Sequence, residues 1–454
     1  MITKVYTLSL TYSLDRLFYY FSNIAHHPWS MLLTSGHSNH QYSRFDIFST
    51  DPCSTITTYR DITVITQGNS VTHSKNDPLV IVQQQCDILG IKVKSNSNLP
   101  FQGGAIGLFG YDLGRRFEKI PQIAKDDITT PDMAIGIYDW ALIADHYLKK
   151  LTLVSLNSPQ DRWQWLLSQN NILKSEDFIL TSDWESNLTF DDYAKRFYII
   201  QEYIHAGDCY QVNLAQRFQA TYRGNEWQAF LYLNKYNRAP FSAFLKLPTS
   251  SMLSFSPERF LLLQNRQIES RPIKGTIPRL FEPIADLHQA RKLAHSIKDR
   301  AENLMIVDLL RNDIGRVAIP GSILVPELFV VEPFPTLYHL VSTVRGFLKK
   351  KFSPVDLLRS CFPGGSITGA PKIRAMEIIE ELEPHCRNAW CGSIGYISLC
   401  GRMDININIR TLIAEKQYIY CTAGGGLVAD SILKEEYEEI FHKINPIMSK
   451  LKNK

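Results

Sequence analysis

The chain has 454 residues, of which 44% are hydrophobic and 21% are charged, so it is long and apolar enough to bury a large core. Its 49 basic and 45 acidic side chains leave a net charge of +4 that is spread along the sequence. These values indicate a globular protein and do not support one that binds nucleic acid.

Membrane, secreted and zinc-binding proteins are also disfavoured. The sequence has no stretch of about 18 consecutive apolar residues, and its first residues lack the pattern of a secretory leader, so we expect a cytoplasmic protein without a membrane anchor. The eight cysteines include no Cys-x-x-Cys pair, which indicates reduced, packed thiols rather than disulfides or a zinc site.

The predicted elements change in character along the chain. The sequence of residues 1–185 predicts short strands and loops. We expect a first subdomain at 1–185 and a second at 186–454, with the boundary between them. Thr189 and Asp192 resemble a capping box that begins a helix ending at Gly207. The expected elements after this helix are, in order, a strand at 210–215, a strand pair at 252–255 and 259–263, a helix at about 286–312, a helix from Pro371, strands at 392–399 and 403–414, and a helix from about Leu433. Such a mixture predicts an α/β or α+β sheet protein.

A glycine-rich loop at 362–372 precedes one of the predicted helices. Gly364 and Gly369 have the spacing of a phosphate-binding loop, but Ala370 stands where that motif needs lysine, so an ATPase is not indicated. Pro371 suits the first position of a helix, and a helix N-terminus behind glycines favours a bound carboxylate or phosphate. A tight loop without a ligand is the alternative.

Two further segments could bind an anion. Gly424, Gly425 and Gly426 end a strand that begins near Tyr418, and glycines there permit a ligand to approach the backbone closely. Arg410 follows an alternating strand, where its guanidinium could bind a carboxylate or form a structural salt bridge.

Acidic side chains occur on two of the predicted helices. Between Leu304 and Leu310 only Asp308 is polar, which predicts that both faces of this helix are buried together with Glu302. Glu436 and Glu439 lie three residues apart on one flank of the last helix. Opposed to Glu302, they would form an oxygen site suited to Mg²⁺, although their spacing alone favours a solvated acidic face.

Lys274 is the most pointed candidate for covalent chemistry. It lies between prolines, and burial together with the cations Arg271 and Arg279 would lower its pKa, as a nucleophilic role requires. A surface lysine in a turn is the alternative. Glu258 opens the preceding strand and could supply the acid or base for a leaving hydroxyl, or could pair with Arg259.

Together these residues resemble the chorismate-utilising enzymes, a family that includes anthranilate, isochorismate, salicylate and aminodeoxychorismate synthases. The resemblance extends over nearly the whole chain and is carried by the segments 100–104, 110–116, 272–276, 302–313, 365–372, 409–410 and 423–426. It implies a fold like that of anthranilate synthase component I, with two subdomains, a β-sandwich core flanked by helices, and the active site in a cleft.

The residue at position 274 distinguishes members of this family. Anthranilate synthases carry alanine there, whereas the aminodeoxychorismate enzymes carry lysine, as this chain does. The resemblance therefore implies that Lys274 adds to carbon 2 of chorismate while the carbon 4 hydroxyl leaves with help from Glu258. Ammonia then attacks carbon 4 and expels the lysine, which gives 4-amino-4-deoxychorismate for para-aminobenzoate and folate biosynthesis.

The resemblance also implies the ligands of the site. Mg²⁺ would be held by Glu302, Glu439 and Glu436 and would offset their repulsion of the anionic substrate. His339 lies in an apolar run, where a core histidine is the common explanation, but it matches a family histidine near the reacting ring. The positions that match substrate-binding residues are Gly365, Thr368, Gly369, Lys372, Tyr396, Arg410, Gly424, Gly425 and Gly426.

A partner and a second ligand follow from the same resemblance. No glutaminase signature is visible in the chain, so we expect a separate glutamine amidotransferase subunit in a heterodimer, with free ammonia sufficing in vitro. The family can carry tryptophan in the N-terminal sandwich, and we expect any bound tryptophan to be structural because residues 33–36 depart from the regulatory pattern. The candidates for this pocket are Ser35, Tyr42, Ser43, Arg44, Phe45, Pro240 and Phe241.

Three alternatives stay open at this point: an anthranilate synthase, an isochorismate synthase, and a non-catalytic paralogue that binds an amino acid in the N-terminal pocket.

Overall fold

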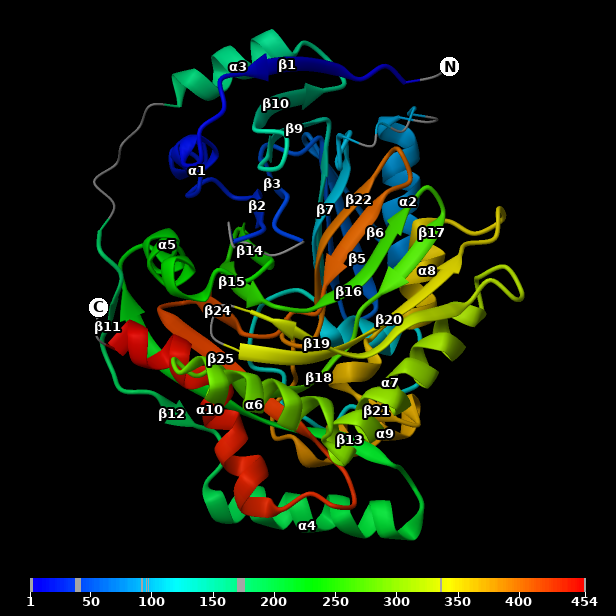
Figure 1. Cartoon of the computed structure of the whole chain (residues 1–454). Coiled ribbons are helices and arrows are strands. Elements are labelled where there is room, and N and C mark those ends of the chain that lie inside the picture. Colours follow the sequence, from blue (N-terminus) through cyan, green and yellow to red (C-terminus); the bar gives the residue numbers. More distant parts are fainter. Residues whose placement is uncertain are drawn as a thin grey trace.

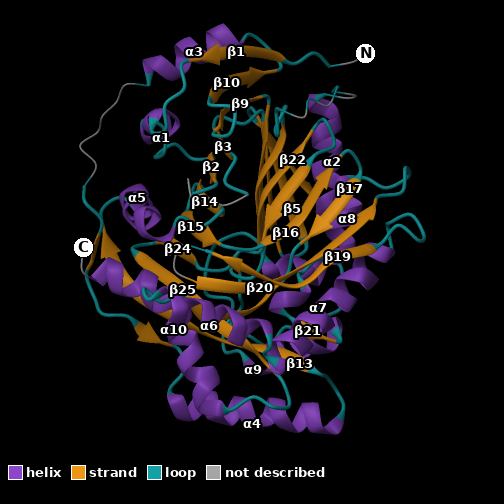
Figure 2. Ribbon diagram, viewed as in Figure 1, coloured by secondary structure: helices purple, strands orange, loops and turns teal. Residues whose placement is uncertain are grey.

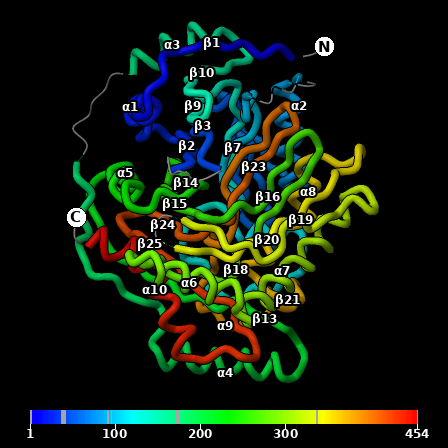
Figure 3. The backbone as a smooth tube through the Cα atoms, in the orientation of Figure 1, coloured from blue at the N-terminus to red at the C-terminus, as the bar shows by residue number. Residues whose placement is uncertain are grey.

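Two antiparallel β-sheets lie at the centre of the molecule, and helices surround them (Figure 1). The computed structural model describes residues 3–36, 42–90, 93–94, 96, 98–169, 176–334 and 337–452. Both sheets contain strands from the first and the last third of the chain, and Figure 3 shows the early blue and cyan segments running beside the late orange ones.

The first sheet has 13 strands. Its order is β1 (Tyr6–Leu10), β10 (Lys150–Ser155), β9 (Trp140–Asp145), β3 (Phe45–Ser49), β2 (Ser30–Thr34), β14 (Phe241–Lys246), β15 (Ser250–Ser256), β24 (Thr411–Glu415), β25 (Tyr418–Leu427), β13 (Gln211–Arg223) and β11 (Ile179–Leu180). Two short strands, β12 (Glu185–Ser186) and β21 (Gly369–Ala370), also pair with β13.

The second sheet has 12 strands. Its order is β18 (Ile273–Pro278), β20 (Leu337–Phe347), β17 (Gln267–Ser270), β16 (Arg259–Gln264), β23 (Met403–Asn406), β22 (Ser393–Ser398), β7 (Gly104–Phe109), β8 (Met133–Tyr138), β4 (Ser54–Tyr59), β5 (Ile62–Gln67) and β6 (Ser70–Ser74), with β19 (Leu324–Pro333) beside β20.

Helices cover the outer faces of the sheets, as Figure 2 shows. They are α1 (Arg16–Ser22), α2 (Pro78–Leu89), α3 (Pro159–Ser168), α4 (Phe190–Ala206), α5 (Glu226–Asn237), α6 (Pro283–Ala294), α7 (Ile297–Gly315), α8 (Pro354–Cys361), α9 (Lys372–Leu382) and α10 (Leu433–Lys452), with short 3-10 helices at Tyr111–Arg116 and Gly365–Ile367. No helix within the described ranges is both long and apolar enough to cross a bilayer.

Three apolar clusters give the molecule its layers. One lies between the sheets and joins Met31 and Ile413 of the first to Ile106 and Ile394 of the second. The other two lie outside, one between the first sheet and helices that include α4, α5 and α10, and one between the second sheet and α2, α7 and α8. Burying both faces of each sheet explains why its central strands, such as β8, are apolar at nearly every position.

The predicted sandwich of β-strands flanked by helices is therefore present. Helix α4 begins at the predicted capping box of Thr189 and Asp192 and ends at Gly207, whose φ of +84° favours glycine. Whether 1–185 and 186–454 behave as separate subdomains stays a prediction, since hydrogen-bonded strands from both ranges share each sheet.

Several predicted elements were wrong in detail. The helix expected at 286–312 is two helices, because the Ser296 hydroxyl accepts a bond from the Asp299 amide and caps a new N-terminus. Helix α9 begins at Lys372, and Pro371 is its N-cap rather than its first residue. Residues 1–185 also contain helices, two of which begin with a capped proline, at Pro78 and Pro159.

Two errors concern the crossings between sheets. Strands β15 and β16, which were expected to pair, belong to different sheets, because the chain crosses from one to the other at 257–258. The strand expected at 403–414 is likewise divided into β23 and β24, with Arg410 at φ +53° just before β24. Both crossings bring candidate site residues to the same end of the sandwich, since the Ile407 amide donates to the Glu258 carbonyl at 3.1 Å.

Candidate active site

Lys274 lies on β18 and faces the glycine segment of β25. A Cβ atom built on Gly426 would lie 3.2 Å from the Lys274 Nζ atom. Strand β18 is an edge strand beside β20 and packs against α7, which carries Glu302. The fold thus brings the predicted nucleophile, one predicted acid and one predicted glycine segment together from three separate elements.

The surroundings of Lys274 favour a neutral amine. Burial lowers the pKa of Lys274, and the ammonium of Lys443 lowers it further, while Glu302, Glu258 and Glu439 act in the opposite direction. The net direction agrees with the prediction.

The prediction that Arg271 and Arg279 cause this pKa shift was wrong. Arg271 is bound to Glu327 and Glu332, and Arg279 is bound to Asp286 at 2.8 Å. Sequence reasoning missed Lys443, which reaches the site from α10.

Glu258 lies just before β16 and is prepared to exchange a proton. Burial raises its pKa to about 7, although a hydrogen bond with Ser366 and the charge of Lys274 act to lower it. The alternative ion pair with Arg259 is not formed, because the Arg259 guanidinium binds Asp404 at 3.0 Å. Ser366, which sequence reasoning missed, therefore links the first glycine loop to the carboxyl group.

Two of the three predicted metal-binding acids, Glu436 and Glu439, are held by lysines and by a serine. The Glu436 Oε1 atom accepts hydrogen bonds from Lys298 Nζ at 2.8 Å and from Ser431 Oγ at 2.7 Å. Glu439 pairs with Lys443 at 2.6 Å, and Lys443 also donates to the Gly424 carbonyl. The second glycine segment and α10 are thus joined by charged side chains.

These acids influence one another. Burial raises the pKa of Glu302, and Glu436 and Asp299 raise it further, against Lys274 and Lys298. A Cβ atom on Gly425 would lie 3.4 Å from Glu436 Oε2, so this carboxylate faces the glycine segment. Lys298, also missed from the sequence, is their counter-ion on α7.

The donor chemistry of Glu302, Glu436 and Glu439 fits a hard cation such as Mg²⁺. Across the described part of the chain, however, no three His, Cys, Asp or Glu side chains are grouped so as to hold a metal ion. Binding would require the carboxylates to exchange their lysine partners for the ion.

Arg410 supplies an uncompensated positive charge. Burial lowers its pKa to about 10, and no described residue forms an ion pair or hydrogen bond with its guanidinium. The alternative, a structural salt bridge, is therefore absent from the described residues. Arg410 is half-buried, and a partly desolvated cation without a partner is costly, so an anionic ligand would relieve that cost.

The first glycine loop packs tightly around its own backbone. A Cβ atom on Gly365 would lie 2.5 Å from Leu309, and one on Gly369 would lie 2.0 Å from the Gln211 carbonyl oxygen. The Thr368 hydroxyl donates to the Gly364 carbonyl at 2.9 Å. Lys372 donates to Asp313 at 2.6 Å and to the Cys361 carbonyl. Thr368 and Lys372 are thus engaged inside the protein, and their contact with substrate stays a prediction.

His339 lies beside the strand that carries Lys274. It is buried on β20, and its Nδ1 atom lies 2.8 Å from the Thr276 hydroxyl of β18. The Phe334 ring packs edge-on against it. The contact with Thr276 ties the histidine to the Lys274 segment, while a role near the reacting ring stays a prediction.

Gln211 is a buried polar residue that sequence reasoning missed. It begins β13, and neither its amide oxygen nor its amide nitrogen has a hydrogen-bond partner among the described residues. A Cβ atom on Gly426 would lie 2.6 Å from Gln211 Nε2, so the amide and Lys274 approach the same glycine. The alternating pattern at 210–215 indicated only a strand and gave no reason to select this side chain.

The predicted tryptophan pocket is a separate cavity of about 200 Å³. Its lining includes six of the seven candidates, Ser35, Tyr42, Arg44, Phe45, Pro240 and Phe241. Ser43 is not in the lining, and its hydroxyl donates to the Ser35 carbonyl at 3.0 Å. Tyr396 also lines this cavity and packs against Phe101, so its predicted contact with substrate has no support from its position.

Comparisons with known proteins agree with this geometry. Residues 32–449 match the family described as chorismate binding enzyme. Aminodeoxychorismate synthase component 1 of Escherichia coli K12 is 59% identical over 444 residues, which cover 98% of both chains. Anthranilate synthase component 1 of Acetivibrio thermocellus is 33% identical over 91% of this chain and 88% of its own.

A solved structure has the same fold. Anthranilate synthase component I from Streptococcus pneumoniae TIGR4 superimposes with a TM-score of 0.79 at 32% identity, covering 90% of this chain and 93% of its own. This similarity confirms the predicted fold like that of anthranilate synthase component I.

Proposed function

Because the chain belongs to the family of chorismate binding enzymes, we propose that it converts chorismate and ammonia to 4-amino-4-deoxychorismate. The observation that carries this proposal is the half-buried Lys274, whose pKa is lowered by desolvation and whose amine faces the glycines of β25 near Glu258. The similarity to relatives named aminodeoxychorismate synthase component 1 supports the same product.

The first step forms a covalent intermediate. The neutral Lys274 amine attacks carbon 2 of the ring, both ring double bonds shift by one position toward carbon 4, and the bond between carbon 4 and its hydroxyl oxygen breaks. Glu258, with a pKa of about 7, donates the proton that lets the hydroxyl leave as water.

The second step reverses this displacement with a new nucleophile. Ammonia attacks carbon 4, both ring double bonds shift back, and the bond between carbon 2 and the Lys274 nitrogen breaks. The ionised Glu258 carboxylate takes the proton that the new ammonium group loses, which returns both side chains to their initial states.

We assign binding of the substrate carboxylates to Arg410 and to the glycine segment of β25. Arg410 offers a guanidinium that has no ion-pair partner among the described residues, and Gly425 and Gly426 carry no side chain on the face of β25 next to Glu436 and Lys274. The guanidinium would gain an anionic partner when the substrate binds.

We propose that Glu302, Glu436 and Glu439 hold Mg²⁺. When bound, the ion would supply positive charge that offsets these carboxylates and stabilises a substrate carboxylate beside them. Lys298 pairs with Glu436 and Lys443 pairs with Glu439, so the ion would compete with these lysines for the two carboxylates.

The name component 1 of the relatives indicates a partner component. We propose a glutamine amidotransferase subunit that supplies ammonia in a heterodimer, and a cytoplasmic location. The cavity bordered by Tyr42 and Phe241 would hold tryptophan as a structural ligand, because its aromatic lining and arginines suit an aromatic amino acid.

A reaction with the purified chain tests the proposal. Chorismate, Mg²⁺ and ammonium are supplied, and the product is identified by mass spectrometry and by its conversion to para-aminobenzoate with a separate lyase. We expect 4-amino-4-deoxychorismate. Anthranilate fluorescence without the lyase, or isochorismate as the main product, would instead assign one of the alternative enzymes.

A further inference from the structure

A buried ion pair between Glu383 and Arg387 fills a gap in the edge of β13. One edge of β13 pairs with β25, while the other pairs with β11 at 222–223, with β12 at 218–219 and with β21 at 211–212, which leaves a gap between β21 and β12. Between these strands, Glu383 Oε1 accepts from the Ala215 amide at 3.0 Å, and the Asn213 carbonyl accepts from Arg387 Nη2 at 3.0 Å. The side chains of Glu383 and Arg387 thus bond the backbone of β13 where no strand pairs with this edge, next to the candidate active site.

The same arginine also holds the first glycine loop. Arg387 Nη1 donates to the Ile367 carbonyl at 2.8 Å, and Asn213 Nδ2 donates to the same oxygen at 3.0 Å. Two bonds of 2.8 and 2.6 Å fix Arg387 to Glu383. Arg387 is 4% exposed, and its guanidinium lies over the rings of Tyr111 and Trp390. It is therefore fully committed to internal contacts.

These bonds set the two glycine segments relative to each other. Ile367 belongs to the loop that contains Gly365 and Gly369. On the other side, Asn213 pairs directly with Gly426, and Ala215 pairs with Gly424. One side-chain pair thus connects both segments that we propose to enclose chorismate.

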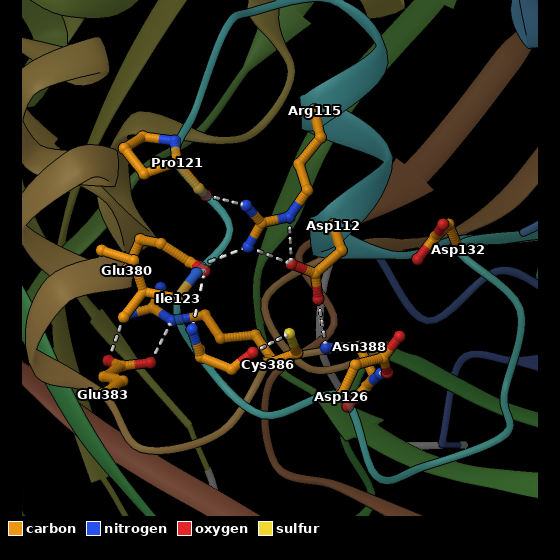
Figure 4. Close-up of polar contacts among 12 residues, drawn as sticks. Asp112, Arg115, Pro121, Ile123, Asp126, Asp132, Glu380, Glu383, Cys386 and Asn388 are labelled. Atoms are coloured by element: carbon orange, nitrogen blue, oxygen red, sulfur yellow. Dashed lines mark hydrogen bonds and ion pairs between the residues drawn. The ribbon is translucent and has the colours of Figure 1, made fainter. Parts of the chain in front are cut away.

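The segment that carries Arg387 is anchored by the N-terminal half. The Asn388 amide donates to Asp112 at 2.7 Å, and the Tyr111 amide donates to the Asn388 carbonyl at 2.7 Å. Figure 4 shows Asp112, Arg115 and Glu380 clustered beside this segment, with Glu383 and Asn388 at its margin. This anchoring gives Arg387 a rigid base.

We propose that Arg387, paired with Glu383, is a positioning residue that holds the two glycine segments at the spacing needed to bind chorismate productively. This inference rests on the proposed function. Arg387 does not reach the substrate; it acts through the backbone of Ile367 and Asn213. Its planar fork matters because it serves a carboxylate and two carbonyls at once, which a lysine ammonium cannot do in the same geometry.

Kinetics of two variants test the proposal. We expect R387M to lower kcat/KM for chorismate by about 100-fold, with KM raised as well as kcat lowered, and R387K to lose about 10-fold, because small misplacements of binding groups cost rate. The matched control is R217M, which removes another buried ion pair of β13, that of Arg217 with Asp127, without touching either glycine segment. We expect R217M to keep the kcat and KM of the unmodified chain.

Hydrogen exchange of the ligand-free chain supplies a readout that does not depend on activity. A peptide covering 364–370 should exchange about 10-fold faster in R387M and at an unchanged rate in R217M, since the loop loses one of its connections to β13 in R387M alone. N213A removes only one bond to Ile367 and should give a smaller change in the same direction. If R387M does not fold, R387K and N213A carry the test.

The outcomes are separable from those of the proposed function. Folded R387 variants with unchanged exchange and unchanged KM would overturn the positioning role. An unmodified chain that makes no 4-amino-4-deoxychorismate would overturn the proposed function. In that case the exchange experiment would still show whether Arg387 fixes the loop.

Discussion

The charged region around Lys274 and the aromatic cavity beside Tyr42 are two polar interiors with opposite properties. In the cavity two of the arginines are paired with carboxylates, since Arg259 binds Asp404 and Arg44 binds Asp145. Around Lys274 the pKa values of the lysine, Glu258 and Arg410 are all displaced by burial. Paired charges can retain a ligand, whereas a Glu258 pKa of about 7 and a lowered Lys274 pKa bring both groups toward the range in which they exchange protons near neutral pH.

Removing the amine of Lys274 should have the largest effect on activity of any change in either region. We expect K274A to reduce formation of 4-amino-4-deoxychorismate by about 1,000-fold or more, because the covalent route is lost, with only direct attack by ammonia remaining. Product is measured by mass spectrometry. K434A, which removes an exposed lysine of α10, is the control and should react normally. Equal rates for K274A and the unmodified chain would exclude a nucleophilic lysine.

Glu258 should control the pH dependence. Its protonated form is the active acid, so kcat/KM should fall about tenfold per pH unit above the Glu258 pKa of about 7 and should not fall on its account below it. E258Q should lose about 100-fold in kcat/KM, and its residual activity should lack this alkaline limb. A pH profile of both proteins from pH 5 to 9 measures this. A limb that persists in E258Q would belong to another group.

Arg410 should affect binding more than chemistry. We expect R410M to raise KM for chorismate by about 10-fold to 100-fold, since a charge-assisted bond is worth roughly 1.5–3 kcal/mol. Steady-state kinetics over a range of chorismate concentrations separate KM from kcat. R402M, which alters an arginine of the aromatic cavity, is the matched control and should leave KM for chorismate unchanged.

A substitution in the aromatic cavity should affect tryptophan binding and leave catalysis unchanged. F241A should weaken tryptophan binding by about 10-fold, because a ring contact is lost, while kcat and KM for chorismate stay within about twofold. Calorimetric titration with tryptophan and steady-state kinetics measure the two effects. A large loss of activity in folded F241A would mean that the two interiors are coupled.

The sequence indicated the fold and the main site residues where short segments determine them. The capping box at Thr189 defined α4, and the segments around Lys274, Glu302 and Gly424 identified three faces of one site. The failures involve partners that are distant in sequence. Nothing near position 274 shows that Lys443 is its neighbouring cation, or that Arg259 prefers Asp404 to Glu258.

Sheet membership was missed for the same reason. Strands β15 and β16 are separated by only a short link and have the pattern of a hairpin, yet each pairs with other strands. Leu304 shows the complementary error, since an apolar run predicted two buried faces of α7, but this side chain is 45% exposed. Local patterns report how apolar a segment is, while the topology decides which of its faces is covered.

The interleaved strand order has a consequence for synthesis of the chain. Strand β7 pairs with β22, and β13 pairs with β25, so both sheets require residues from the last quarter of the sequence. A nascent chain on the ribosome cannot complete either sheet until translation is nearly finished. Early strands therefore keep unpaired edges until the late strands are made. Because such edges can pair with other chains, we expect the yield of folded protein to depend on protection against aggregation during synthesis.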